Sequence, residues 1–215
     1  MNPFHQLTSL RKHFIVYLFP PLLIIANYFA FNFFVAIFNA KEGYLSGMMF
    51  YWILFCIIPI VLWINRKNRR LLFRIKKINW WQAALVVLPV IFAFGFGPFK
   101  SRIGEATPMI ILLSLLFALV NAICEEYLWR GLYFDHHQAN FFYAVIVPSI
   151  WFGIWHYAPL SVHPATIGNF YFILAAIGMG LCWGIVTFYT RSVFWSVISH
   201  TLVDLSGLGA LYFLK

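Results

Sequence analysis

The sequence predicts an all-α fold, a polytopic membrane helical bundle of about seven transmembrane helices, formed by one membrane domain over residues 1–215. Hydrophobic residues make up 63% of the chain, charged residues only 10%, and the mean hydropathy is +0.83. Soluble domains contain about 25% charged residues. Several apolar runs reach the roughly 20 residues that cross a ~30 Å hydrocarbon core as a helix. The loops between these runs are short, so no separate soluble domain is expected.

The apolar runs give the expected helices in order. The first contains Pro20 and Pro21, which a membrane bundle tolerates because neighbouring helices satisfy the freed carbonyl groups. The expected spans lie near 14–38, 44–64, 80–99, 109–134, 141–157, 170–190 and 193–213.

The basic residues predict the orientation of the bundle. Arg11 and Lys12 precede the first span, and the loop 65–77 holds seven Lys and Arg residues. Cytoplasmic loops are enriched in Lys and Arg, so we expect a multi-pass protein of the inner (plasma) membrane with a cytoplasmic amino terminus. The lipid bilayer is the expected partner of this charge, and the loop can contact anionic lipid. Nucleic-acid binding is not expected, because no soluble basic domain is present.

Three of the six acidic residues fall inside apolar segments. They are Glu125, Glu126 and Asp204. A charged side chain at the bilayer centre costs at least about 2.5–3.5 kcal/mol on the insertion scale, and such residues mark functional sites. The buried acidic residues therefore predict a site within the membrane.

The stretch "EEYLWRG" suggests different tasks for its two glutamates. Glu126 and Arg130 are four positions apart and can pair on one helix face. Glu125 lies about 100° round the helix from Glu126, so one arginine does not easily serve both. Two adjacent carboxylates repel in low dielectric, which favours a protonated form and a general acid or base. A purely structural Glu–Arg pair between helices is the alternative interpretation.

Two further motifs place histidines in apolar helices. "FGIWH" puts Phe152 and His156 on one face, with Gly153 permitting a close helix approach. "HTLVD" puts His200 and Asp204 one turn apart, where the carboxylate can fix the imidazole tautomer. A lone histidine in a span is often a packing residue, whereas a His–Asp pair is less easily explained by packing.

These motifs, E-E-x-x-x-R, F-x-x-x-H and H-x-x-x-[N/D], in this order and on separate helices, resemble those of the CPBP family of intramembrane proteases. That family includes the type II CAAX prenyl endopeptidases and the bacteriocin-processing and Abi-type proteins. The resemblance covers catalytic core motifs within about 110–207. Many relatives carry asparagine at the last position of the third motif, where this chain has Asp204.

The resemblance implies an endopeptidase that hydrolyses a peptide bond in the membrane. It assigns Glu125 and His156 to the activation of water, and His200 and Asp204 to the oxyanion or the orientation of substrate. Glu126, Arg130 and Phe152 are expected to support them. We expect a glutamate-type mechanism without a cofactor, because the H-E-x-x-H motif is absent. The alternative is a zinc site made by His156, His200 and either Glu125 or Asp204.

Other functions remain open from the residues alone. The same carboxylates could serve as the relay of a proton-coupled transporter or channel. The chain could also be a non-catalytic immunity or regulatory member of the same fold. For the peptidase, short loops imply a membrane-embedded or lipid-anchored peptide or protein substrate.

Overall fold

A computed structural model describes residues 10–214 of the chain, so the amino terminus itself lies outside the described part. The described residues form helices joined by short turns, without a β-strand among them. This arrangement confirms the all-α fold. The α-helices are α2 (Phe19–Ile37), α3 (Ala40–Phe50), α4 (Ile58–Trp63), α5 (Arg66–Leu72), α6 (Trp80–Phe96), α7 (Phe99–Arg102), α8 (Pro108–Glu126), α9 (Tyr133–His137), α10 (Val147–Trp155), α11 (Tyr157–Leu160), α12 (Asn169–Thr190), α13 (Phe194–Leu205) and α14 (Ala210–Leu214).

Several helices continue through wider or tighter turns. The π-helical segments are η1 (Phe14–Leu18), η2 (Tyr51–Ile57), η4 (Tyr127–Leu132) and η5 (Phe142–Ile146), and η3 (Ile103–Glu105) is a 3₁₀ turn. The segment η4 joins α8 to α9 directly, so Pro108–His137 is one long apolar helix. π-Helical turns are frequent at functional sites, and η4 carries Arg130.

Within residues 10–214, four helices are long and apolar enough to cross a membrane. They are Leu10–Ile37, Ala40–Trp63, Pro108–His137 and Asn169–Thr190. A fifth is added if Trp80–Phe96 and Phe99–Glu105, which are bent by 52°, form one broken span.

The expected number of seven spans is therefore not confirmed. The other two predicted segments are helical but interrupted. α10 ends at Trp155, and α13 has 12 residues, about 18 Å of helix.

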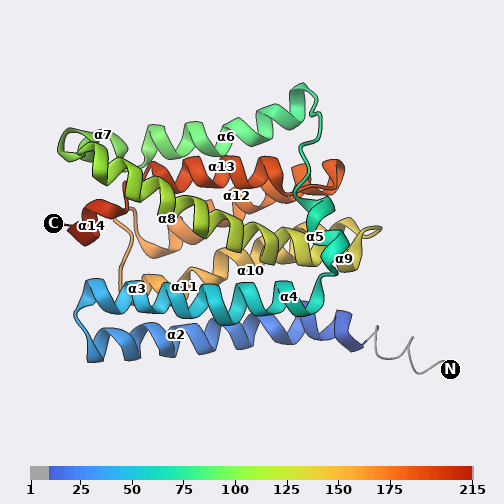
Figure 1. Ribbon diagram of the computed structural model, residues 1–215, viewed down its shortest axis with the longest axis horizontal. Coiled ribbons are helices and arrows are strands. Elements are labelled where there is room, and N and C mark those ends of the chain that lie inside the picture. The colour runs from blue at the N-terminus through green and yellow to red at the C-terminus, as the bar shows by residue number, and fades with distance from the viewer. Residues whose placement is uncertain (1–9, 215) are drawn as a thin grey trace.

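The helices pack side by side, and α8 crosses the middle of the view in Figure 1. α2 lies against α3, α10 against α12, and α13 against both α8 and α6. Gly153 on α10 permits its contact with α12, because an added Cβ would clash with the Ile177 side chain and lie 2.8 Å from the Ile173 carbonyl oxygen. This confirms the close helix approach expected at Gly153.

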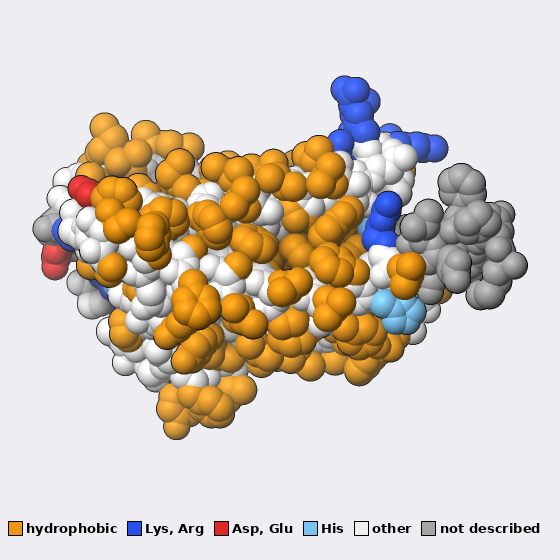
Figure 2. Space-filling model, turned by 90° about the horizontal axis from the view of Figure 1, so that it is seen from below, with side chains coloured by type: hydrophobic (Ala, Val, Ile, Leu, Met, Phe, Trp, Pro, Cys, Tyr) orange, Lys and Arg blue, Asp and Glu red, His pale blue; other side chains and the backbone are white. Residues whose placement is uncertain are grey.

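The surface has the character of a membrane protein. Figure 2 shows hydrophobic side chains over one face of the bundle, with Lys and Arg side chains gathered at one end. In Figure 1, α5 and the start of the described chain lie at one end, and α7 and α14 lie at the other. The two basic segments of the sequence therefore share an end of the molecule.

Candidate active site

Glu126 and Arg130 form a buried ion pair at the end of α8. Thr107 caps the start of this helix by accepting a hydrogen bond from the Ile110 backbone N–H, and Pro108 takes the first turn, where its missing N–H costs nothing. Arg130 Nη1 donates to Glu126 Oε1 at 2.9 Å. Both side chains are at most 1% exposed. The predicted i, i+4 pairing is present.

His200 on α13 joins both glutamates. Its Nδ1 lies 2.8 Å from Glu126 Oε1, and its Nε2 lies 3.4 Å from Glu125 Oε2. Nε2 is also 3.5 Å from Oδ1 of Asp204, one turn along the same helix. The packing of α13 on α8 thus brings four of the predicted residues, Glu125, Glu126, His200 and Asp204, into one cluster.

Aromatic faces surround the Arg130 guanidinium. Its Cζ lies 4.3 Å from the ring centre of Phe152 and 5.2 Å from that of Trp183. Its Nε and Nη2 have no hydrogen bond within residues 10–214. The two rings therefore provide the remaining stabilisation of the buried cation.

Trp183 also holds the imidazole of His200. The two rings stack with centres 4.3 Å apart and planes 17° apart. The indole Nε1 donates to Ser199 Oγ at 2.9 Å, and that hydroxyl donates to the Val86 carbonyl at 2.6 Å. Trp183 is thereby fixed to both α13 and α6.

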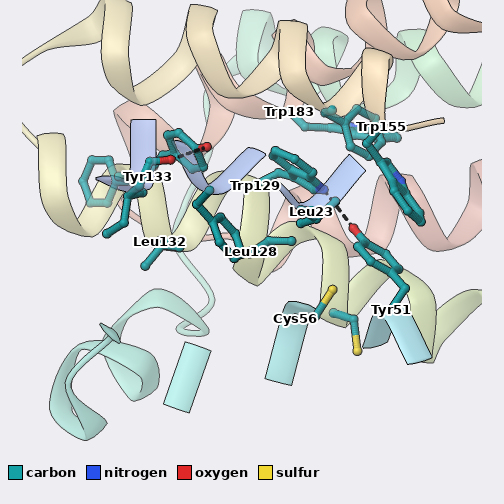
Figure 3. Close-up of a cluster of buried hydrophobic side chains, with 14 of the residues drawn as sticks. Leu23, Tyr51, Cys56, Leu128, Trp129, Leu132, Tyr133, Trp155 and Trp183 are labelled. Carbon is teal, nitrogen blue, oxygen red and sulfur yellow. Dashed lines mark hydrogen bonds between the residues drawn. The ribbon is translucent and has the colours of Figure 1, made fainter. Parts of the chain in front are cut away.

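Glu125 is oriented by Asn121, which lies outside the motifs, and by Trp155, which occupies an unspecified position of the second motif. Trp155 Nε1 donates to Glu125 Oε1 at 2.8 Å, and Asn121 Nδ2 donates to Oε2 at 3.2 Å. Trp155 stacks on Tyr51 with ring centres 3.7 Å apart. Trp129 Nε1 donates to the Tyr51 hydroxyl at 3.0 Å, drawn as a dashed line in Figure 3. The aromatic core and the site are thus one continuous packed unit.

Asn121 links Glu125 to Asp204. The same Nδ2 donates to Asp204 Oδ2 at 2.8 Å, and Asn121 Oδ1 accepts from Trp52 Nε1 at 2.9 Å. The side chain of Asp204 is 26% exposed, whereas that of Glu125 is 2% exposed. Asp204 therefore forms the accessible edge of the cluster, and Glu125 its interior.

His156 stands apart from the carboxylates. Its Nδ1 lies 2.7 Å from the Phe152 carbonyl oxygen, and its ring meets the Phe152 ring edge-on at 4.8 Å. Phe152 also meets the His200 ring at 5.8 Å. Within residues 10–214, His156 has no hydrogen bond or ion pair with Glu125 or another carboxylate. Phe152 is the neighbour that the two histidines share.

Asn121, Trp155 and Trp183 are the site residues that the motifs do not specify: Asn121 and Trp183 lie outside the motifs, and Trp155 takes an unspecified position of the second. Asn121 lies one turn before Glu125 in an apolar helix, so its spacing was a usable signal. The sequence signal for the two tryptophans was weaker. A buried indole N–H needs a hydrogen-bond acceptor, but the chain has nine tryptophans, and the sequence does not distinguish these two from the others.

A metal site would have to be formed by the same side chains. Residues 10–214 contain no group of three or more His, Cys, Asp or Glu side chains arranged to hold a metal ion. Both ring nitrogens of His200 face carboxylate oxygens, whereas a zinc ligand needs a lone pair directed at the metal. These residues do not fit the alternative zinc site, and we derive no chemical step through it.

Comparison with known proteins identifies the region that carries the site. Residues 107–206 match the family model "Type II CAAX prenyl endopeptidase Rce1-like", and this range contains all three motifs. No curated protein and no solved structure gave a match. The family match confirms the resemblance to the CPBP proteases and supports, at family level, an intramembrane CAAX-type protease with a membrane-associated protein substrate. Residues 107–206 are therefore similar to the Rce1-like type II CAAX prenyl endopeptidase family.

Proposed function

We propose that the protein is an intramembrane endopeptidase in which Glu125 activates a water molecule for attack on a peptide bond. The observation that carries this proposal is the contact of 3.4 Å between the buried Glu125 carboxylate and His200 Nε2. Glu125, as the proton acceptor, and His200 Nε2, as the hydrogen-bond donor, therefore lie next to each other. Hydrolysis of an amide needs both, a general base and a donor to the developing oxyanion.

In the proposed reaction, Glu125 transfers one proton from the water molecule to the leaving amide nitrogen. Glu125 takes a proton from water as the oxygen attacks the carbonyl carbon. The carbonyl oxygen becomes an oxyanion, which accepts a hydrogen bond from Nε2–H of His200; in this step His200 is an imidazolium, because its Nδ1–H donates to Glu126 at the same time. Glu125 then returns the proton to the amide nitrogen as the carbon–nitrogen bond breaks.

In this proposal, Glu126 and Arg130 orient the imidazole ring of His200. Glu126 Oε1 accepts from His200 Nδ1 at 2.8 Å, so the other nitrogen is directed at Glu125 and Asp204. Arg130 holds Glu126 at 2.9 Å. We infer that this pair orients the imidazole, and that Asp204 orients it from the accessible side.

His156 has a separate part in the proposal. Its Nδ1 is engaged by the Phe152 carbonyl oxygen, which leaves Nε2 available for a hydrogen bond to water. We propose that it assists Glu125 through a water molecule and not by direct contact. The proposed mechanism uses no metal.

The site favours a substrate that lies in the membrane. Glu125 is in a helix about 18 Å from its end at His137, in a bundle with apolar flanks. We propose a substrate whose scissile bond is membrane-embedded or close to a lipid anchor. We also propose a plasma-membrane location with the basic end in the cytoplasm.

Mass spectrometry of membrane-protein termini tests the function. Cells that produce the intact protein are compared with cells that produce Glu125→Gln, and Glu42→Gln serves as the matched control because Glu42 is exposed on α3. We expect a set of new termini that is lost in Glu125→Gln and kept in Glu42→Gln. A general base contributes about 10²–10⁴-fold in rate.

Other outcomes separate the alternatives. Termini that are identical in all three strains, together with proton-coupled transport that requires Glu125, would indicate a transporter. A cellular task that survives Glu125→Gln without any cleavage would indicate a non-catalytic binding protein.

A further inference from the structure

Two adjoining pockets at the α4–α5 end of the bundle have no part in the proposed chemistry. The first, about 510 Å³, is lined mainly by apolar side chains of η2, α4 and α8 together with Arg69 and Arg70. The second, about 480 Å³, is lined by Leu71 and four cationic side chains. Arg70 lines both pockets, so we treat them as one basic groove. The four cationic residues are Arg66, Lys67, Arg70 and Arg74.

In the part of the chain that the structure describes, the protein does not neutralise the positive charge of the basic groove. Among these residues, no acidic side chain lines either pocket. Within residues 10–214, none of the four cationic side chains forms an ion pair with the protein. Arg69 differs, because its Nη1 donates to the carbonyl oxygens of Ile60 and Val61 at 3.1 and 3.0 Å. That contact fixes α5 against the end of α4 and gives the groove a defined wall.

The other part of the basic groove is an apolar slot. Ile57 and Ile60 form one side, and Ile123 on α8 forms the opposite side. Tyr127 closes it near the cations, where its hydroxyl donates to the Arg69 carbonyl at 2.9 Å. A cationic end joined to an apolar slot matches the chemistry of an anionic phospholipid, whose phosphate pairs with Arg and whose acyl chain needs an apolar surface.

We propose that the basic groove binds one anionic phospholipid, with the phosphate at Arg66, Arg70 and Arg74 and an acyl chain between Ile57 and Ile123. The basic end would then be anchored to the leaflet that carries anionic lipid. The proposal is independent of peptide hydrolysis, since within residues 10–214 none of these side chains forms a hydrogen bond or ion pair with Glu125 or His200.

Native mass spectrometry of the purified full chain tests the proposal. The protein in detergent is mixed with phosphatidylglycerol or with phosphatidylcholine of the same acyl chains. We expect one phosphatidylglycerol to be retained in preference to phosphatidylcholine. Arg70→Gln should weaken its binding about fivefold, the effect of one cation near an anionic surface. Lys77→Gln removes the same charge from the same loop outside the groove and should leave binding unchanged.

A second variant tests the apolar slot without changing charge. Ile57→Trp fills the slot from an exposed position, so it should reduce phosphatidylglycerol binding while the protein remains folded. Equal retention of both lipids, or equal weakening by Arg70→Gln and Lys77→Gln, would overturn the proposal. Displacement of the lipid by millimolar inorganic phosphate would also overturn it, because the groove would then bind a small anion alone.

Discussion

Glu126 on α8 and His200 on α13 are 74 positions apart in the sequence, and their side chains meet at 2.8 Å. The same Glu126 oxygen accepts from Arg130 at 2.9 Å. One buried carboxylate oxygen therefore joins the cation of its own helix to the imidazole of another. This contact ties the stability of the bundle to the geometry of the site.

Glu126→Gln should lower both stability and activity. Arg130 and His200 would lose their shared anionic partner in a buried position, and breaking a buried ion pair costs about 3–5 kcal/mol. Thermal unfolding in detergent should show a lower melting temperature than for Glu42→Gln, the exposed control.

A compensating pair of changes checks the cause. Glu126→Leu combined with Arg130→Met removes both charges and should recover part of the lost stability. Recovery should be incomplete, because His200 Nδ1 still lacks an acceptor. An unchanged melting temperature in Glu126→Gln would refute the structural role of this carboxylate.

Trp155→Phe should reduce catalysis while keeping the core. The change removes the N–H that donates to Glu125 at 2.8 Å but keeps a ring to stack on Tyr51. A hydrogen bond to a charged group contributes about 1.5–3 kcal/mol, so we expect roughly 10–100-fold lower kcat. The control is Trp80→Phe, since Trp80 is 83% exposed. Equal kcat in both variants would mean that Glu125 needs no support from Trp155.

Gly180→Ala should destabilise the protein through Arg130. A Cβ at this position would lie 2.8 Å from Arg130 Nη2 and 3.3 Å from the Phe152 ring. Overpacking typically costs about 1–3 kcal/mol. Gly178→Ala is the matched control on the same helix, because its added Cβ meets no atom within 4 Å. Melting temperatures of the two variants should differ, and equal values would contradict the tight fit around Arg130.

Purified protein should hold no stoichiometric zinc. Both nitrogens of His200 are directed at carboxylates, and His156 lies apart from them. Elemental analysis of the intact protein and of His156→Ala tests this expectation. About one zinc per chain, lost in His156→Ala, would replace the glutamate mechanism with a zinc mechanism.

The sequence predicts the helices and the local pairs well, because both depend on short-range spacing. Composition indicates the all-α membrane class, and the i, i+4 rule gives the Glu126–Arg130 pair. The number of long spans does not follow from hydropathy, because an apolar segment gives no sign that its helix is interrupted. The expected span 193–213 is an example: α13 ends at Leu205, and a turn separates it from α14 (Ala210–Leu214).

Contacts between helices were less predictable than contacts within one. Spacing brings His200 close to Asp204, but only the packing of α13 on α8 brings Nδ1 to Glu126. Trp183 stacks on His200 from α12, a helix that carries none of the three motifs. Such contacts depend on helix rotation and crossing, which an apolar sequence pattern leaves open.

Asp204 accepts a hydrogen bond from the side-chain amide of Asn121, and substitutions at both positions test what Asp204 does in the site. Asn121 Nδ2 donates to Asp204 at 2.8 Å and to Glu125 at 3.2 Å, so it separates two carboxylates that would otherwise repel. Asn121 and His200 contact different oxygens of Asp204, so Asp204→Asn keeps one oxygen that can accept from either Asn121 or His200. It also adds an N–H that can donate to an oxyanion.

We therefore expect Asp204→Asn to cleave substrate at no less than about a tenth of the original rate, whereas Asp204→Leu should lose about 10²-fold or more. Asn121→Asp should be inactive and less stable, because a fourth acidic side chain would then join Glu125, Glu126 and Asp204 in one cluster without the amide between them. Single-turnover cleavage in detergent, with melting temperatures measured in parallel, distinguishes these outcomes. If Asp204→Asn were as inactive as Asp204→Leu, the negative charge of Asp204 would itself be required, and its task would be to polarise His200 and not to present a hydrogen bond to substrate.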